Sequence, residues 1–329
     1  MRKQQNFTTG QPAITTTYAG EFAGKYISAA LLSAKTLDNR YVTIMPNVKF
    51  KSVIQKVQLA DIVSNATCDF TTTGSVALTE RILEPKELQV NLSLCKQEFV
   101  DSWEALQLGY SAFDTIPANF NDYLISYVGG FVAQSTETSI WQGVAATNGQ
   151  FGGFQAAFSA SVALSSSTSV IAAGASSPTS HTGAISGSVT SANVLSKLDS
   201  VVNSIPGAVY GKEDVLLYVS TNVGKAYQQA LAGGAVGANG WNNTMNVGEK
   251  PFNFNGIEIV LCPGLSDNKI VAAQKSNLFF GTGLLSDHNE VKVLDMADLD
   301  GSQNYRVIMR YTAGTQFGIG QDIVYYGAY

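Results

Sequence analysis

The sequence predicts an α+β protein organised around one long helix and the strands that precede it. Large apolar residues occupy every second position from Leu88 to Leu94, which places them on one face of a strand. A pattern with helical spacing follows at about 118–141, and shorter strand and helix patterns alternate from residue 190 onward. Because strands mixed with helices in this way form layered domains, we expect an α+β or α/β layer and not a β-sandwich.

The N-terminal part predicts an arm without a core of its own. Residues 1–24 are polar, and their large apolar residues are too widely spaced to pack together: Phe7, Ile14, Tyr18 and Phe22. A free terminus of this kind is usually disordered, unless its apolar residues lie in grooves of a neighbouring subunit. A short helical pattern follows within residues 25–37.

Residues 41–79 predict a long excursion that resembles a hairpin. Strand patterns at 41–44 and 47–59 lead into a turn-rich stretch at 61–73, and the return begins at Ser75. The apolar residues of the longer outgoing strand are Val48, Phe50, Val57 and Leu59. Two strands alone are marginally stable in water, and their exposed edges invite pairing with other chains. The excursion therefore predicts a partner.

The next two strand patterns, at 75–83 and 88–95, are separated by a charged turn that contains Pro85. Proline fixes φ and removes a donor from the ladder. We expect either a hairpin or two neighbouring strands of one sheet.

The helix pattern is preceded by Pro117, which suits a first helical turn. The apolar stripe is expected to consist of Phe120, Leu124, Tyr127, Phe131, Thr138 and Trp141. Gly129 and Gly130 lie in mid-helix, where each glycine costs about 1 kcal/mol relative to alanine. They predict a kink or the close approach of a neighbouring backbone, and Gly143 predicts a C-terminal cap.

Residues 144–190 read as serine-rich loops, tethered to the body by the aromatic pair Phe151 and Phe154. Beyond them, Thr190 and Ser220 are expected to cap two helices, and a glycine-rich loop at 232–246 surrounds Trp241. Strands are expected at 215–219, 305–312 and 315–326, and further strand or short-helix segments at 257–261, 270–273, 278–280 and 291–296.

Composition excludes several classes of function. The net charge is −5 and only 14% of residues are charged, whereas a nucleic-acid reader would present a basic face. The sequence has neither a run of 18 apolar residues nor an apolar signal-peptide core. Its three cysteines are far apart, which predicts neither a disulfide framework nor a zinc site and is typical of a reducing cytoplasm. Low charge is also a property of interface cores.

No stretch predicts catalytic chemistry. His181 and His288 each lack a second ligand nearby, and Asp298-x-Asp300 lacks the later ligands of a calcium loop. The segment from Gly281 to Ser286 lacks the third glycine of a dinucleotide fingerprint. We therefore expect no enzyme, and no catalytic, cofactor-binding or metal-binding residues.

The order of these parts carries a resemblance to a known family. Four stretches are similar to that family in their residue pattern: 139–143 (SIWQG), 214–220 (DVLLYVS), 275–284 (KSNLFFGTGL) and 306–316. With the polar arm, the excursion and the long helix, residues 25–329 resemble a major capsid protein of tailed bacteriophages (Caudoviricetes), which has the Hong-Kong-97-type fold.

The resemblance implies four parts. Residues 1–35 would form the N-terminal arm and 36–75 the extended loop (E-loop). Residues 76–189 would form the peripheral domain, with its spine helix at about 118–141 and a completing strand near 303–312. Residues 190–302 and 313–329 would form the axial domain.

The resemblance also implies a function. The chain would self-assemble as hexamers and pentamers into an icosahedral virion shell enclosing double-stranded DNA, formed in the host bacterial cytoplasm. Implied partners are a portal protein at one vertex, separate scaffolding and cement or decoration proteins, and non-specifically contacted DNA, but no membrane. Candidate assembly contacts are Phe7, Ile14, Tyr18, Phe22, Val48, Phe50, Val57, Leu59 and Trp241.

Three alternatives remain open. An encapsulin-like nanocompartment shares the capsid fold, and a β-rich surface adhesin would suit the abundant Ser, Thr and Gly. An enzyme with a Rossmann-like C-terminal half would rest on Gly281–Ser286 alone.

Overall fold

The computed structural model describes residues 35–48, 50–60, 65, 68, 75–95, 118–180, 183–233, 252–283, 292–296, 301–302 and 304–327. Five candidate contact residues lie outside these ranges: Phe7, Ile14, Tyr18, Phe22 and Trp241. The helical pattern at 25–37 is described only at its end, where α2 covers Lys35–Asp38.

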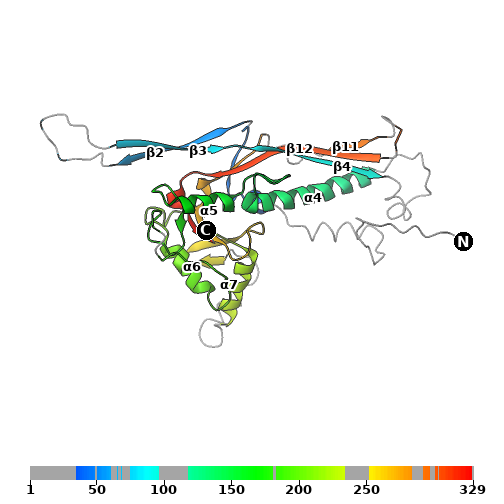
Figure 1. Cartoon of the computed structure of the whole chain (residues 1–329). Helices are drawn as coiled ribbons and strands as arrows, with labels where there is room; N and C mark the ends of the chain where they lie inside the picture. The colour runs from blue at the N-terminus through cyan, green and yellow to red at the C-terminus, as the bar shows by residue number, and fades with distance from the viewer. Residues whose placement is uncertain are drawn as a thin grey trace.

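A five-stranded sheet forms the elongated upper layer of the molecule (Figure 1). Its central strand, β12 (Asn304–Phe317), pairs antiparallel with β4 (Lys86–Cys95) from Asn304↔Cys95 to Ala313↔Lys86. Strand β11 (Lys292–Asp295) pairs with the first part of β12, and β10 (Leu278–Gly281) pairs with its last part. Strand β1 (Thr43–Met45) adds to β10 in parallel.

The spine helix α4 (Ala118–Gln142) runs beneath β4 and β12, as the sequence predicts (Figure 1). Among its described side chains, those of residues 128–142, the buried apolar ones are Val128, Val132, Ile140 and Trp141. The expected stripe is wrong at Phe131, which is 46% exposed. Of the two roles expected for the glycines, the close approach of a neighbouring backbone is wrong at Gly129, since a Cβ there would meet nothing within 4 Å; the kink stays a prediction.

A second, six-stranded sheet lies below the helix, in the order β5-β13-β9-β6-β8-β7. These strands are Ile171–Ala172, Val324–Tyr326, Ile270–Gln274, Val215–Val219, Ile257–Leu261 and Phe252–Phe254. Every residue of β6, β9 and β13 is buried, as short continuous apolar runs predict. Helices α6 (Val194–Asn203) and α7 (Thr221–Gly233) complete this lower layer.

An aromatic cluster joins the two layers. Helix α5 (Phe154–Leu164) was not expected within the serine-rich stretch, although Phe154, Phe158 and Val162 have helical spacing and are fully buried. Phe158 contacts Phe317 at a ring-centroid distance of 5.4 Å. Trp141 of α4 lies 5.4 Å from Tyr218 of β6 by the same measure. Both layers therefore share one core.

The predicted excursion is confirmed as an antiparallel ribbon of β2 (Ser52–Ala60) and β3 (Ser75–Leu83), paired from Ser52↔Leu83 to Ala60↔Ser75. The expectation that 75–83 and 88–95 form a hairpin or neighbouring strands is wrong. Strand β3 pairs with β2, whereas β4 pairs with β12. The turn at Pro85 thus passes the chain from one sheet to another.

Strand pairing also corrects expectations near the C-terminus. The expected last strand at 315–326 is two elements: residues 315–317 end β12, and β13 begins only at Val324. The short 3₁₀ helix Gly320–Asp322 lies between them, and another covers Lys275–Asn277. Strands β10 and β11 belong to the upper sheet, so residues 190–302 do not all belong to the lower layer.

Two expected helix caps are replaced by other contacts. Asn193, not Thr190, occupies the N-cap position of α6, and its Oδ1 accepts from the Thr190 N–H at 2.8 Å. Gly143 follows α4 because a Cβ there would lie 2.2 Å from the Phe151 carbonyl oxygen. Close packing, and not a left-handed cap, explains this glycine.

Candidate assembly surfaces

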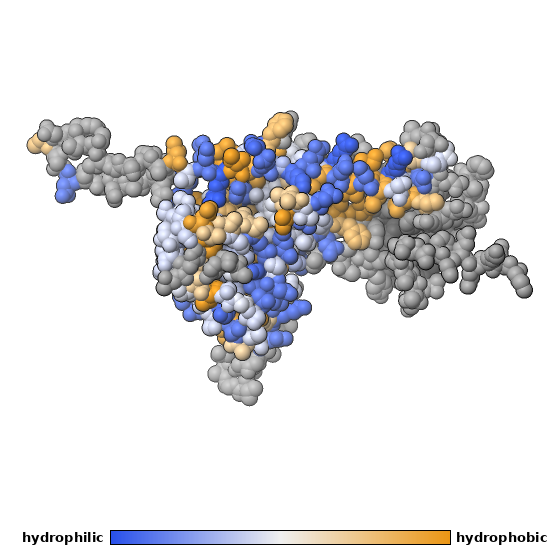
Figure 2. All heavy atoms as spheres, viewed as in Figure 1, coloured by the Kyte–Doolittle hydropathy of each residue, from blue (hydrophilic) through white to orange (hydrophobic). Residues whose placement is uncertain are grey.

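One face of the β2–β3 ribbon exposes apolar side chains. Val53 stands opposite Ile82 in the register, and Leu78 lies four residues before Ile82, so all three share a face. Their exposed fractions are 49% for Val53, 49% for Ile82 and 69% for Leu78. We call these three residues the ribbon's apolar face. Phe50, just before β2, is 83% exposed, and Figure 2 shows apolar residues among polar ones along this upper layer.

The opposite face of the ribbon is fixed to the body at its root. Leu83 is fully buried, and Arg81 lies over the Phe317 ring with its guanidinium carbon 3.9 Å from the centroid. Arg81 Nε donates to the Gly318 carbonyl oxygen at 3.1 Å. The ribbon then extends beyond the body (Figure 1). Because side chains alternate along a strand, one face of the ribbon packs on its own subunit and the other is exposed to solvent.

A buried polar junction fixes the start of the described chain to the spine helix. Glu137 of α4 is fully buried and accepts from Thr36 at both carboxylate oxygens, from the hydroxyl at 2.6 Å and the backbone N–H at 3.1 Å. The Thr36 hydroxyl in turn accepts from Trp141 Nε1 at 3.0 Å. Burial raises the pKa of Glu137, and the bonds from Thr36 oppose that rise.

The same junction reaches the lower layer through Gly264. Gln142 Nε2 donates to the Gly264 carbonyl oxygen at 2.7 Å. A Cβ on Gly264 would lie 2.1 Å from the Glu137 carbonyl oxygen, so only glycine allows this approach. Residue 36, the spine helix and the lower sheet therefore meet at one point.

The described residues offer no group of three or more His, Cys, Asp or Glu side chains that would hold a metal ion. Gly281 and Gly283 have packing roles: a Cβ on Gly281 would meet Leu83, and a Cβ on Gly283 would meet Thr312. His181, His288, Asp298 and Asp300 lie outside the described residues. No helix in the described part is long and apolar enough to cross a membrane.

Comparison with known proteins reveals a likeness in structure alone. No protein-family model and no curated protein sequence matches the chain. A chain from the capsid of a native GTA particle superposes with a TM-score of 0.58 at 13% identity, covering 91% of this chain and 98% of that one. The chain has the fold of tailed-phage major capsid proteins.

Chains from two phages extend this likeness over the capsid fold. A chain of Mycobacterium phage Adephagia superposes with a TM-score of 0.56 at 12% identity, covering 91% of this chain and 92% of its own. A chain of Gordonia phage Cozz gives 0.53 at 11% identity and covers 99% and 100%. These matches span both layers and not one domain alone.

The capsid fold lets the expected contact residues be sorted. Phe50 is on the surface, as expected of a contact residue. Val48 is wrong as a candidate, because it is 7% exposed and its N–H donates to the Thr282 carbonyl oxygen of its own subunit. Val57 and Leu59 lie in β2, but their side chains are outside the description.

Sequence reasoning missed Val53, Leu78 and Ile82 as candidate contact residues. The pattern at 75–83 contains Leu78 and Ile82 at alternate positions, but by itself it predicts only a strand. The signal that identifies them is the register with β2, which places Val53 opposite Ile82. That register follows from pairing across the turn-rich stretch and cannot be read from either strand alone.

Proposed function

We propose that this chain is the major capsid protein of a tailed phage, assembling as hexamers and pentamers into an icosahedral shell that encloses double-stranded DNA. The observation that carries the proposal is the ribbon's apolar face, presented on the E-loop of a capsid fold. Burying a Val, Leu or Ile side chain contributes about 1.5–3 kcal/mol. A face of three such residues therefore favours association with another subunit.

The proposal assigns the parts of the chain by strand pairing. The arm is residues 1–35, and the E-loop is the ribbon with its flanks, within 36–83. The peripheral domain comprises β4, α4, β10, β11 and β12. The axial domain is built on the six-stranded sheet, which takes its strands from 171–172, 215–274 and 324–326.

The role is structural and non-enzymatic, and the protein belongs in the virion after assembly in the bacterial cytoplasm. A portal protein, a separate scaffolding protein and decoration proteins are proposed partners. Packaged DNA would be contacted without sequence readout, since an acidic chain with net charge −5 has no excess of cations to grip it.

The ribbon can be shortened without disturbing the body. A deletion of residues 45–72, most of the predicted excursion, would also remove Met45 from β1 and the buried Val48. Because Lys56 stands opposite Thr79, replacing residues 57–78 by Asn-Gly closes the ribbon with a two-residue turn. Purified wild-type and shortened proteins are compared by negative-stain microscopy and by sedimentation velocity.

We expect closed icosahedral shells from the wild type and soluble, folded subunits from the shortened variant. A wild-type protein that stays monomeric at high concentration would contradict the capsid role, as would closed shells from the shortened variant. Double-stranded DNA in native particles supports a virion. Its absence, with an enclosed protein cargo, would assign the shell to an encapsulin-like compartment instead.

A further inference from the structure

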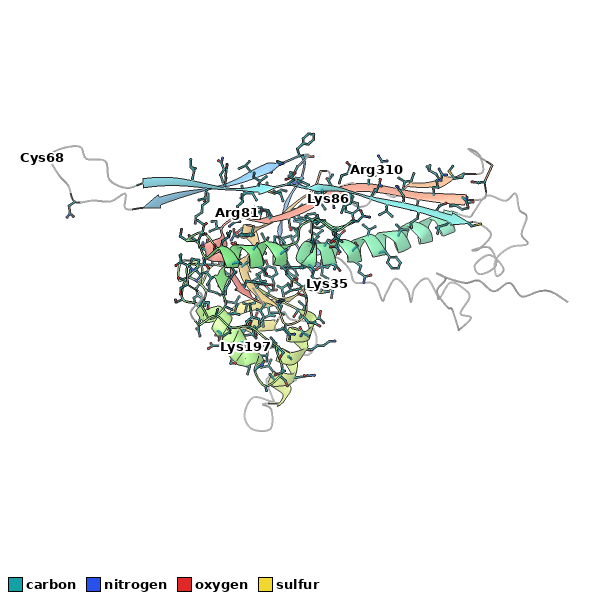
Figure 3. All side chains as sticks on the ribbon, in the orientation of Figure 1. Lys35, Cys68, Arg81, Lys86, Lys197 and Arg310 are labelled. Carbon is teal, nitrogen blue, oxygen red and sulfur yellow. The ribbon has the colours of Figure 1, made fainter. Side chains whose placement is uncertain are left out.

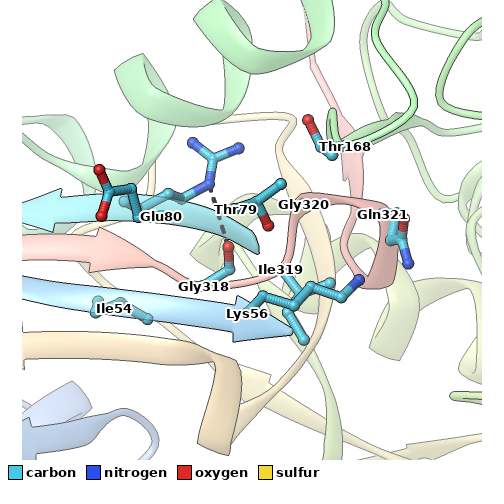
Figure 4. A pocket seen from close by; sticks show the side chains of 10 residues that line it. Ile54, Lys56, Thr79, Glu80, Thr168, Gly318, Ile319, Gly320 and Gln321 are labelled. Carbon is cyan, nitrogen blue, oxygen red and sulfur yellow. Dashed lines mark hydrogen bonds between the residues drawn. The ribbon is translucent and has the colours of Figure 1, made fainter. Parts of the chain in front are cut away.

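A polar pocket of about 320 Å³ opens at the root of the ribbon (Figure 4). One wall is the inward face of β2 and β3, with Ile54, Lys56, Thr79 and Arg81. The opposite wall is the turn after β12, residues 318–321. Its volume is near the lower end of the range for ligand sites, about 300–1,000 Å³, which suits a side chain and not a large cofactor.

Two glycines shape the wall formed by the turn. A Cβ on Gly320 would lie 2.5 Å from the Thr168 carbonyl oxygen, and a Cβ on Gly318 would lie 2.9 Å from Asn277 Oδ1. The turn therefore packs directly on the body through its backbone. Asn277 Oδ1 also accepts from the Ile319 N–H at 2.7 Å, and Asn277 Nδ2 donates to the Ile319 carbonyl oxygen at 2.8 Å. Because Asn277 fixes the backbone of this turn, the wall of the pocket is a fixed part of the folded subunit.

Arg81 brings an incompletely paired cation to this pocket. Its Nε donates to the Gly318 carbonyl oxygen, and its guanidinium carbon lies over the Phe317 ring. Its two Nη groups have no hydrogen-bond or ion-pair partner among the residues that the structure describes. Partial burial lowers the pKa of Arg81, but an arginine stays protonated in proteins. The cost of removing this charge from water is not offset by an anion.

Lys56 supplies a second cation on the same ribbon face. With the Gln321 amide oriented to donate to the Ser167 carbonyl oxygen, its Oε1 accepts from Lys56 Nζ at 2.7 Å. Asp322 lies close enough for Lys56 to lower its pKa, although burial raises that pKa by more. Glu80 lines the pocket rim, but strand alternation directs its side chain to the ribbon face opposite Arg81. The two anionic residues therefore lie at the edge of the pocket, Asp322 on the Lys56 side and Glu80 at the rim. Neither is paired with the Arg81 Nη groups among the described residues.

We propose that this pocket receives an Asp or Glu carboxylate from a neighbouring copy of this chain, with the Arg81 Nη groups as its donors. The inference rests on the proposed self-assembly. The fork of a guanidinium matches the two oxygens of a carboxylate. The chain supplies carboxylates in excess, with 25 Asp and Glu residues against 20 Lys and Arg.

The surroundings favour a carboxylate over a nucleic-acid backbone. A nucleic-acid strand presents a row of phosphates, whereas this pocket of about 320 Å³ has room for a single acidic side chain. The site therefore fits one acidic side chain of a protein.

Assembly of Arg81 variants tests the proposal. Arg81→Gln removes the charge and the fork, Arg81→Lys keeps the charge alone, and Arg310→Gln is the matched control. Arg310 is exposed on the upper sheet, away from the ribbon root (Figure 3). The concentration at which shells form is measured by sedimentation at two NaCl concentrations. Thermal melting of the unassembled subunits reports any structural role of Arg81.

We expect the assembly concentration to rise by about tenfold or more for Arg81→Gln, because a buried charge pair loses one member. Arg81→Lys should lie between Arg81→Gln and the wild type, and Arg310→Gln should match the wild type. Salt should weaken wild-type assembly more than Arg81→Gln assembly. A three-dimensional reconstruction of wild-type shells should show a carboxylate of an adjacent subunit within 4 Å of the Arg81 Nη atoms.

Equal assembly of Arg81→Gln and wild-type shells would overturn the inference while leaving the capsid role intact. A lowered melting temperature of Arg81→Gln subunits with unchanged salt dependence would reduce Arg81 to a structural residue and overturn it too. A phosphate backbone at Arg81 in the reconstruction would do the same. Wild-type protein that forms no shells would overturn the proposed function, and this inference with it.

Discussion

Thr36 is the residue through which the N-terminal end of the described chain is attached to the spine helix. It donates two hydrogen bonds to the buried Glu137 and accepts one from Trp141. Buried polar groups that lose a partner cost about 1–3 kcal/mol each. The hydroxyl of Thr36 satisfies two such groups at once.

We expect Thr36→Ala to lower the free energy of unfolding of the subunit by about 2–4 kcal/mol at neutral pH. Thr36→Ser keeps the hydroxyl and should lose about 1 kcal/mol or less, the value of one methyl group. Urea denaturation followed by circular dichroism measures both. Equal losses for the two variants would contradict a role for the hydroxyl.

The pH dependence of this loss follows from Glu137. Its pKa is raised in the folded state, so the folded protein holds the proton more tightly than the unfolded chain, and stability falls as pH rises through the folded pKa. Removing the Thr36 hydroxyl raises that pKa further. The destabilisation by Thr36→Ala should therefore be larger at pH 8 than at pH 5. A difference that is constant across this range would exclude an ionised Glu137 as its cause.

At the scale of elements, the β2–β3 ribbon divides its two faces between its own subunit and solvent. Leu83 and Arg81 hold the body, while Val53, Leu78 and Ile82 are exposed. Monomeric proteins commonly expose single apolar residues. A face of three on a ribbon that extends from the body is the feature that indicates a partner.

Changing the ribbon's apolar face should therefore impair assembly and spare the fold. The triple variant Val53→Thr, Leu78→Thr and Ile82→Thr keeps residues that favour strands. We expect subunits with a melting temperature within about 4 °C of the wild type, in line with a change of at most about 1 kcal/mol, and no shells by electron microscopy. The control is Gln89→Thr with Asn91→Thr, at exposed polar positions of strand β4 away from the ribbon, and it should assemble. Shells from the triple variant would show that this face is not an interface.

At the scale of the whole molecule, stability should be unevenly distributed. Three strands of the six-stranded sheet are buried in every residue, whereas the contacts that the structure describes between the two-stranded ribbon and the body lie at the ribbon's root. Local opening is easiest where few buried contacts resist it.

We expect backbone amides of β6 and β9 to exchange slowly with deuterium in both unassembled subunits and shells. Amides of β2 and β3 should exchange quickly in subunits and become protected by about tenfold or more in shells, where a neighbour covers them. Hydrogen exchange read by mass spectrometry provides the measurement, with β6 peptides as the internal control. Ribbon amides that exchange equally fast in both states would contradict an E-loop role.

The sequence by itself determined the features that rest on local periodicity. The spine helix, the ribbon, the buried strand β6 and most of the buried face of α6 follow from spacings of two, three and four residues, because each pattern reports which side of one element avoids water. In α6, the helical spacing predicts that Leu195 shares the buried face with Val194, Leu198, Val201 and Val202, but Leu195 is 43% exposed. The order of these elements was also enough to indicate the capsid fold.

Only the tertiary structure decided which elements meet. Strand β4 pairs with β12, more than 200 residues later in the chain, and not with the adjacent β3. Glu137 meets Thr36 across 101 residues, and Arg81 meets Gly318 across 237. Such contacts depend on register and on the packing of separate layers, and no local pattern encodes either. The long helix and its strands could be predicted from the sequence. The pocket at the ribbon's root could not, because it forms where β2 and β3 pack against residues 318–321, which are distant in the chain.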